Sequence, residues 1–479
     1  MATQLETLRS GVVNFATQAQ LFVEAKKGIL GEIMEREKLL FRTVLGLSIF
    51  HLLLIIFLSP DQLLNDEPRY FSGANNLTKG YFVEEKLPDF TNGPGYPMLL
   101  APVMGLLGFE FDRMIQDPDT FEFYVPGESG EPLKNLKWRL LPLRLLNIPF
   151  LAIGYLAIYF ASKLLIPSRW ALAVMLAMAL NPFQLRWVPM IMTENVTPML
   201  FGLFAWAYIK GLQAKSFSWK LVILAGLAFA WLAMTRTMFG YVALGALLSA
   251  PVLCLIDGYR EKLKAATIPF VAALIFCIPY LSYTHHHTGK VFCWATNGTE
   301  LLYWITSPHE GEYGSWLQEK WVKGDPLLAE NHLSFIQSAS ELPPIEREER
   351  WMEGVKKHLE SEGVEKALVR NYAANLCRVF FNVPRSRKFE NFPKLVWALT
   401  GFVVFLGMAG ATIVTLWKWR DVHMAIKLLL LCFGIYFCGV LLLPAEPRYL
   451  IPVFPAIFLW IAYVLSQLVE VRVSFRPVT

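Results

Sequence analysis

The chain of 479 residues contains repeated apolar blocks of roughly 17 to 25 residues, the length that a helix needs to cross about 30 Å of hydrocarbon. A membrane-spanning segment must satisfy its own backbone hydrogen bonds, so such blocks form helices. They predict an all-α polytopic membrane protein of about ten transmembrane helices. The blocks lie near residues 43–59, 138–162, 170–186, 189–209, 219–235, 238–256, 265–284, 394–416, 424–443 and 450–468.

The charged residues support a membrane protein and exclude a nucleic-acid-binding protein. They make up 17% of the chain, whereas soluble domains carry about 25%. The formal net charge of +5 would suit a nucleic-acid partner, but Lys and Arg gather beside the apolar blocks and not along one face. We therefore exclude nucleic acid as a partner and expect a lipid bilayer.

Basic residues also predict the orientation, because short loops rich in Lys and Arg stay in the cytoplasm. Such residues precede the first block, occupy several short connections and recur in the tail as Arg472 and Arg476. Both termini are therefore predicted on the cytoplasmic side of an inner membrane.

Residues 10–42 fit either an interfacial helix or a solvated extension. The predicted parts are a cytoplasmic extension (1–42), a transmembrane bundle (43–284) with a first outer loop (60–137), an outer soluble cap (285–393), C-terminal transmembrane helices (394–468) and a cytoplasmic tail (469–479).

The tetrapeptide EPRY occurs twice, at Glu67–Tyr70 and at Glu446–Tyr449, and both copies are predicted on the outer face. Apolar residues recur at helical spacing from Tyr70 to Tyr81, which predicts a short helix along the membrane surface. Asp66 occupies its N-cap position and Pro68 its first turn. A second interpretation is that the pair Asp66 and Glu67 supplies a carboxylate that accepts a proton from an acceptor hydroxyl.

Three further ionisable residues lie at the outer ends of predicted helices: Glu194, Arg236 and Arg448. Charges at a membrane edge are costly, so they suggest function. Two structural alternatives stay open. Arg236 and Glu194 fit an ion pair that stabilises broken helices, and Arg448 fits an arginine that extends from the last span into solvent.

Two outer segments complete the predicted site surroundings. Residues 92–108 are too short to span a bilayer and predict a second interfacial helix. The loop 285–393 contains a charged helical stretch and is predicted to form a soluble cap. Cys293 and Cys377 both lie in this loop, where a disulfide and two free thiols remain open.

Five stretches, in this order and with shared sidedness, resemble the lipid-linked-sugar glycosyltransferases of the GT-C fold. The branch they resemble is that of the protein O-mannosyltransferases (dolichyl-phosphate-mannose-protein mannosyltransferase-like) and the lipid A aminoarabinose transferases. The resemblance covers roughly residues 43–468. The stretches are NDEPRYFSGANNLTKGYF with TNGPGYPMLLAPVMGLLG, NPFQLRWVPMIMTENVTPMLFGL, GLAFAWLAMTRTMFGYVAL, GKVFCWATNGTELLYW and PRYLIPVFPAIFLW.

The resemblance implies a polyprenyl-phosphate-linked sugar donor, a glycan, lipid or protein acceptor, and inverting transfer. It implies that Asp66 is the general base with Glu67 as its neighbour, and that the cap lies over the site and contributes to acceptor choice. A guanidinium fork suits the donor phosphate. The implied phosphate-binding residues are Arg236, Arg448 and Arg69, and the other implied site residues are Glu194, Tyr70 and Tyr449.

The chain departs from the family pattern at two places. An insertion rich in Asp, Glu and Pro occupies about residues 110–137, and no DxD motif of the oligosaccharyltransferase kind occurs. No cofactor is certain, and a requirement for a divalent metal stays open. The alternative function is a transporter or flippase for a lipid-linked saccharide, which would place charges near the midplane of the membrane. A relative that has lost activity is the third alternative.

Overall fold

The computed structural model describes residues 37–84, 88–109, 115–116, 123–124, 135–255, 258–381 and 392–469. The chain divides into two compact units, Met1–Phe50 and His51–Thr479. The division falls within the helix Glu37–Leu58, whose first part is the described portion of the first unit. The sequence-based interpretations of residues 10–36, of most of the insertion and of the basic tail lie outside the described residues.

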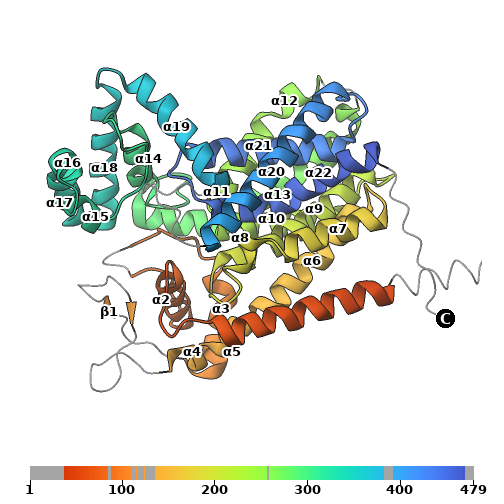
Figure 1. Cartoon of the computed structure of the whole chain (residues 1–479), viewed down its shortest axis with the longest axis horizontal. Coiled ribbons are helices and arrows are strands. Elements are labelled where there is room, and N and C mark those ends of the chain that lie inside the picture. The colour runs from red at the N-terminus through yellow and green to blue at the C-terminus, as the bar shows by residue number, and fades with distance from the viewer. Residues whose placement is uncertain are drawn as a thin grey trace, which may run out of the picture. The chain divides into compact units, whose positions relative to one another are not determined.

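The regular secondary structure of the described residues is helical apart from one short hairpin, which confirms the all-α prediction. The hairpin pairs strand β1 (Ile115–Gln116) with strand β2 (Phe123–Tyr124) in antiparallel register. The apolar helices shown in Figure 1 are α6 (Asn147–Lys163), α7 (Ser168–Ala179), α9 (Thr197–Gln213), α10 (Trp219–Thr235), α11 (Met238–Leu248), α13 (Tyr259–Thr288), α20 (Phe392–Trp417), α21 (Met424–Leu441) and α22 (Phe454–Leu468).

Six helices in the described part of the chain are long and apolar enough to cross a membrane, so the protein is an integral membrane protein. The predicted count of about ten spans is not confirmed. Helices form at all ten predicted blocks, but α7 has only 12 residues and α11 only 11. Such helices are about 18 Å long, well short of the hydrocarbon thickness. The six are Glu37–Leu58, Leu141–Lys163, Tyr259–Thr288, Leu395–Trp417, Met424–Leu441 and Pro447–Leu468.

Small residues allow the helices of the second unit to pack closely, as is usual in membranes. Helix α6 packs on α9, α9 on α10, and α10 on α13. A Cβ atom added to Gly154 of α6 would lie 3.1 Å from the backbone of Met199 in α9. A Cβ atom added to Gly226 of α10 would lie 2.7 Å from Ala272 in α13. These close contacts pack α6 against α9 and α10 against α13.

Short elements join the long helices. The two predicted surface helices are present as α2 (Glu67–Thr78) and α3 (Pro97–Leu107), and they pack against each other. Asp66 is at the N-cap of α2 and Pro68 is in its first turn, as predicted. The other short elements are α4 (Leu136–Arg139), α5 (Leu141–Leu145), α8 (Pro182–Leu185), α12 (Ala250–Leu253), and the 3-10 helices η1 (Thr193–Asn195) and η3 (Pro447–Val453).

The predicted soluble cap contains helices (Figure 1): α14 (Gly298–Thr306), α15 (Glu319–Lys323), α16 (Pro326–Leu328), the π-helix η2 (Ala329–Leu333), α17 (Ser334–Ser340), α18 (Pro344–Leu359) and α19 (Val364–Phe381). Its own apolar core is built around Tyr303, Trp304 and Trp351. A series of buried, hydrogen-bonded polar groups lies beside this core. Tyr303 Oη lies 2.7 Å from His332 Nδ1, and His332 Nε2 lies 2.9 Å from Glu312 Oε1.

Candidate active site

Asp66 stands at the start of α2, but its side chain does not cap that helix. Its Oδ2 atom instead accepts a hydrogen bond of 2.9 Å from Arg448 Nη1, and its Oδ1 atom lies 3.5 Å from Arg69 Nη1. Burial favours the protonated carboxyl, but Arg448 and two further arginines outweigh it and hold the pKa of Asp66 below its usual range. The side chain keeps 21% of its surface exposed, so the carboxylate is charged and partly accessible.

Glu67 is adjacent to Asp66 and has a different environment. Its side chain is fully buried, and its two carboxylate oxygens accept hydrogen bonds of 2.8 Å from the backbone N–H groups of Leu64 and Ile191. Burial raises the pKa of Glu67, while the Arg144 guanidinium and these two N–H groups lower it by less. Glu67 therefore ties the start of α2 to the backbone at Ile191.

Arg448 is the second side chain of the contact with Asp66. It lies at the start of η3, where Glu446 Oε2 is 2.9 Å from its Nε atom. The guanidinium carbon lies 5.9 Å from the ring of Trp187 and 5.5 Å from the ring of Tyr449. Only 17% of the side chain is exposed. Arg448 therefore folds back onto its neighbours and does not extend from the last span into solvent.

Glu194 and Arg236 form an ion pair close to the contact between Asp66 and Arg448. The sequence left such a pair open as the structural alternative to a functional role for these two residues. Glu194 is fully buried, and its Oε2 atom also accepts a hydrogen bond of 3.2 Å from Thr193 Oγ1. The Thr193 hydroxyl lies 3.4 Å from Tyr70 Oη. Arg236 lies 6.0 Å from the ring of Tyr449, and its Nε atom has no hydrogen-bond partner among the described residues. This arginine therefore retains a free donor.

The irregular segment 181–196, which separates α7 from α9, is held by buried amide side chains. Asn147 Nδ2 donates to the carbonyls of Val188 and Met190 at 2.9 and 2.7 Å. Asn195 Nδ2 donates to the carbonyls of Trp187 and Met190 at 2.8 and 2.9 Å. Backbone groups that leave a helix inside a membrane protein need such partners. These amides therefore fix the backbone that carries Trp187 and Glu194.

The motif NGPGYP, before α3, places its backbone against the end of α10. Gly95 N donates to the carbonyl of Met234 at 3.0 Å, and Trp231 Nε1 donates to the carbonyl of Gly95 at 2.8 Å. A Cβ atom added to Gly93 would lie 2.0 Å from the Met234 carbonyl oxygen, and one added to Gly95 would lie 2.5 Å from Thr235 Oγ1. Both glycines are needed for this approach, which fixes the chain next to Arg236.

Several residues of the site were not predicted from the sequence. Arg144 is fully buried and donates through Nη1 to the carbonyl of Pro60 at 2.9 Å. Asn147 and Asn195 hold the irregular segment 181–196. Arg186 is exposed, with its guanidinium carbon 4.5 Å from the ring of Trp397. The signal in the sequence was the group Asn181, Pro182, Gln184 and Arg186, which interrupts the apolar blocks 170–186 and 189–209. It indicated interrupted helices but not the partners of these side chains.

Among the described residues, no group of three or more His, Cys, Asp or Glu side chains is placed to hold a metal ion. Cys293 is buried, Cys377 is exposed, and both are free thiols in the structure.

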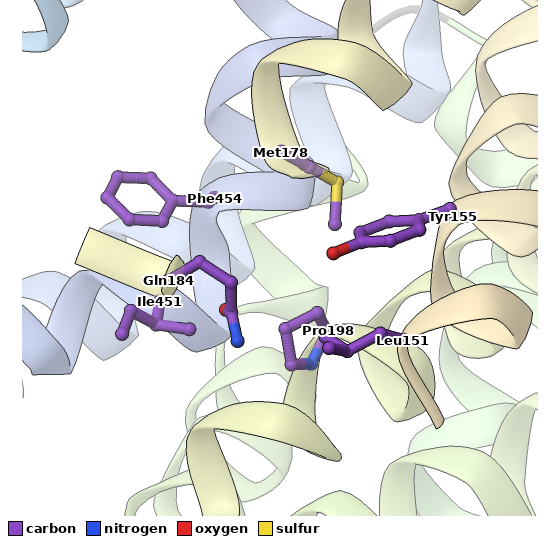
Figure 2. Close-up of a pocket in the computed structure, with 7 residues that line it drawn as sticks. All are labelled: Leu151, Tyr155, Met178, Gln184, Pro198, Ile451 and Phe454. Carbon is purple, nitrogen blue, oxygen red and sulfur yellow. The ribbon is translucent and has the colours of Figure 1, made fainter. Parts of the chain in front are cut away.

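A small cavity lies between α6, α7, α8, α9, η3 and α22. Figure 2 shows the Tyr155 hydroxyl and the Gln184 amide pointing into it from different sides. Its volume of about 10 Å³ is at the lower limit for one water molecule. The cavity is therefore too small for a sugar or a phosphate. The candidate site is the partly exposed contact between Asp66 and Arg448. The lining residues are Leu151, Tyr155, Met178, Gln184, Pro198, Ile451 and Phe454.

Comparison with known proteins gives matches only among solved structures; no protein-family model and no curated protein matches the chain. The oligosaccharyltransferase AglB from Archaeoglobus fulgidus, in complex with an inhibitory peptide and a dolichol-phosphate, is similar over 88% of this chain and 50% of its own, with a TM-score of 0.46 and 12% identity. ArnT from Cupriavidus metallidurans bound to undecaprenyl phosphate is similar over 88% of this chain and 78% of its own, with a TM-score of 0.38 and 15% identity.

The chain thus spans about half the length of the archaeal oligosaccharyltransferase. Because the TM-scores lie below 0.5, these likenesses do not identify an activity. The contacts of Asp66, Arg448, Glu194 and Arg236 are therefore the basis for a proposed function.

Proposed function

We propose that this protein is a membrane glycosyltransferase that moves a sugar from a polyprenyl-phosphate-linked donor to an acceptor on the outer face of the membrane. The contact between Asp66 and Arg448 is the observation that carries this proposal. It joins a charged, accessible carboxylate to a guanidinium at the start of an apolar helix. A general base and a phosphate-binding cation are what such a transfer needs in one place.

The donor phosphate is assigned to Arg448, with Arg236 and Arg69 as additional phosphate-binding residues. The Arg448 guanidinium is planar and can hold two phosphate oxygens at once, whereas a lysine ammonium is a point charge. The rings of Trp187 and Tyr449 restrict where that guanidinium can lie. Arg448 also lies at the start of the apolar segment Pro447–Leu468, so its guanidinium is close to where a lipid-linked phosphate would have to sit.

In the proposed reaction, the acceptor hydroxyl oxygen attacks the anomeric carbon of the sugar and gives its proton to Asp66. A new carbon–oxygen bond forms while the bond between the anomeric carbon and the phosphate oxygen breaks. The electron pair of that bond leaves with the polyprenyl phosphate, whose developing charge is stabilised by Arg448. Attack opposite to the leaving group inverts the anomeric configuration. The acceptor, whether glycan, lipid or protein, supplies only the hydroxyl in this scheme.

Donor binding would also activate the base. Without donor, Arg448 is bonded to Asp66 and lowers the pKa of that carboxyl. A donor phosphate competes for the same guanidinium and brings a negative charge close to Asp66. Both changes raise the pKa of Asp66, because they remove a favourable partner and add a like charge. Asp66 is thus a stronger base when the leaving group is in place.

Two acidic residues receive supporting roles in this proposal. Glu67 is bonded to two backbone N–H groups and positions α2, so Asp66 and not Glu67 takes the proton. Glu194 holds Arg236 and, through Thr193, approaches the hydroxyl of Tyr70. Tyr449 lies between the two arginines, within 6.0 Å of each guanidinium carbon.

The outer-face location is part of the same proposal, with both termini in the cytoplasm. Single cysteines at Ser216, between α9 and α10, and at Glu330, in η2, occupy exposed positions. In intact cells and a cysteine-free background, we expect an impermeant thiol reagent to label only the cysteine at Glu330. Equal labelling of both positions would contradict the outer-face location.

The experiment that tests the assigned base compares Asp66→Asn with Asp61→Asn. The first variant keeps the shape of the side chain but cannot accept the proton, so we expect transfer to fall by a factor on the order of 10² to 10⁴. The control removes a carboxylate that is exposed in the same loop, and we expect it to retain normal transfer. Normal transfer by Asp66→Asn would refute the assignment of the base.

A further inference from the structure

Helix α19 carries two fully buried asparagines one turn apart, Asn371 and Asn375. Residues four positions apart lie on one face of a helix, so both amides point the same way. Buried amides are costly unless they are hydrogen-bonded. Their partners therefore indicate what this face of α19 holds in place.

Asn375 holds the turn that leads into the second EPRY copy. Its Nδ2 atom donates to the carbonyl of Leu441 at 3.0 Å and to the carbonyl of Leu443 at 2.8 Å. Its Oδ1 atom accepts from the N–H group of Ala445 at 3.4 Å and also from Arg378 Nη1. One side chain thus bonds three backbone groups within the turn 441–445, and Glu446 follows that turn directly.

The turn 441–445 sets the position of the backbone from which the Arg448 side chain extends to Asp66. Helix η3, which carries Arg448, packs against α19. On another side, Tyr436 Oη donates to the carbonyl of Tyr449 at 2.9 Å. The start of η3 is therefore tied to α19 before Arg448 and to α21 after it.

Asn371 makes equivalent bonds in the cap. Its Nδ2 atom donates to the carbonyls of Ile305 and Ser307 at 2.9 and 3.2 Å. Gly314 approaches the same side chain so closely that an added Cβ atom would lie 2.9 Å from Asn371 Cβ. Figure 1 shows α19 running from the cap helices toward α20 and α21. The same helix face thus holds the cap with one asparagine and the approach to Arg448 with the other.

We propose that Asn375 is a positioning residue that places Arg448 for the donor phosphate, while Asn371 fastens α19 to the cap without affecting the donor. This inference rests on the proposed function, since Arg448 is the assigned phosphate ligand. Asn375 contacts neither the donor nor Asp66 in this assignment. It acts through the turn 441–445, which sets the position of the guanidinium.

The test compares Asn375→Ala with Asn371→Ala, because each removes one buried amide from the same helix. Hydrogen–deuterium exchange reports the local effect. We expect Asn375→Ala to speed exchange in residues 441–449, including the Ala445 N–H group, and Asn371→Ala to speed it in residues 305–314 only. Exchange that increases equally in both regions for either variant would overturn the division of roles.

Equilibrium binding of undecaprenyl phosphate in nanodiscs reports the consequence for the site. We expect Asn375→Ala to raise the Kd about tenfold, because a misplaced guanidinium loses charge-assisted contacts, and Asn371→Ala to leave it unchanged. Asn375→Asp, nearly equal in volume, keeps the acceptor for Ala445 N–H but turns a carboxylate oxygen toward the Leu441 and Leu443 carbonyls. It should therefore also raise the Kd, and it replaces the alanine variant if that variant fails to fold. An unchanged Kd in both Asn375 variants, or equal increases in the alanine variants of both asparagines, would overturn the inference.

The same measurement separates this inference from the proposed function. If Arg448→Lys raises the Kd but Asn375→Ala does not, only the role of Asn375 is wrong. If the unmodified protein does not bind undecaprenyl phosphate, the proposed function and the inference fail together.

Discussion

The two copies of EPRY have the same four residues and opposite arrangements. In the first copy, Glu67 is fully buried against backbone N–H groups, whereas 56% of Arg69 is exposed. In the second copy, 55% of Glu446 is exposed, whereas Arg448 is 17% exposed and bonded to Asp66. The first copy opens an α-helix and the second opens a 3-10 helix.

The difference shows that surroundings and not the tetrapeptide decide which charge is structural and which faces the site. Beside the first copy, the irregular segment 181–196 supplies the Ile191 N–H group that Glu67 bonds. Beside the second copy, the aromatic rings of Trp187 and Tyr449 and the carboxylate of Asp66 surround the guanidinium of Arg448. One copy therefore contributes a buried anchor, and the other contributes the proposed phosphate ligand.

The largest expected effect separates the two glutamates. Glu67→Ala leaves two backbone N–H groups without partners and removes the negative charge near buried Arg144. We expect it to lower the free energy of unfolding by about 3 to 5 kcal/mol. Glu446→Ala removes a half-exposed contact and should cost about 1 kcal/mol or less. Unfolding in mixed micelles, followed by tryptophan fluorescence, measures both; equal losses would remove the distinction between the copies.

The next effect separates the two arginines. Arg448→Lys replaces a guanidinium fork with a point charge at the assigned phosphate site, so we expect transfer to fall about 10- to 100-fold. Arg69→Lys changes an exposed side chain and should lower transfer about threefold or less. The measurement is kcat and KM with a polyprenyl-phosphate-linked sugar. A larger loss from Arg69→Lys would exchange the roles of the two copies.

The smallest effect concerns pH. A carboxylate acts as a base only above its pKa, and Arg448 lowers the pKa of Asp66 in the donor-free protein. The pH profile of kcat/KM reports the free enzyme. On acidification, kcat/KM should therefore fall to half its maximum at a pH below about 3.9, the usual pKa of Asp. The corresponding fall in kcat should occur at a higher pH, because bound donor draws Arg448 away from Asp66 and so raises the pKa of that carboxyl. A fall of both parameters at the same pH would show that donor binding does not change the base.

The same shift has a consequence for stability, with a definite sign. The pKa of Asp66 is lower in the folded protein than in an unfolded chain. Its contribution to stability is therefore present above about pH 3.9 and is lost as the pH falls through the folded-state pKa. Arg448→Gln should remove part of that contribution, so its unfolding should depend less on pH in this range.

Local features of the sequence predicted much of the fold. The apolar blocks predicted helices, and Asp66 with Pro68 predicted the start of α2, because these signals depend on neighbours in the chain. The predicted number of about ten spans is not confirmed, since the length of an apolar block does not show which of the helices that form in it cross the membrane. The side chain of Asp66 was expected to fit a cap, but Arg448, 382 positions away, binds it.

The supporting side chains could not be predicted either, because their partners lie far away in the sequence. Asn147 bonds carbonyls 41 and 43 positions away, and Asn375 bonds carbonyls 66 and 68 positions away. An isolated Asn in an apolar helix has no periodic pattern that names its partner. Glu194 and Arg236 were paired in advance only because both were costly charges at the same predicted membrane edge.

The most direct test of the central claim follows the bond between sugar and phosphate. Purified protein in nanodiscs is given polyprenyl-phosphate-linked sugars with a radiolabelled sugar, and nucleotide sugars in parallel. We predict that labelled sugar is released or transferred from the lipid-linked donors and not from the nucleotide sugars. The contradicting result, in vesicles, would be movement of the intact lipid-linked sugar across the membrane without cleavage of the phosphate–sugar bond, which would identify a flippase instead.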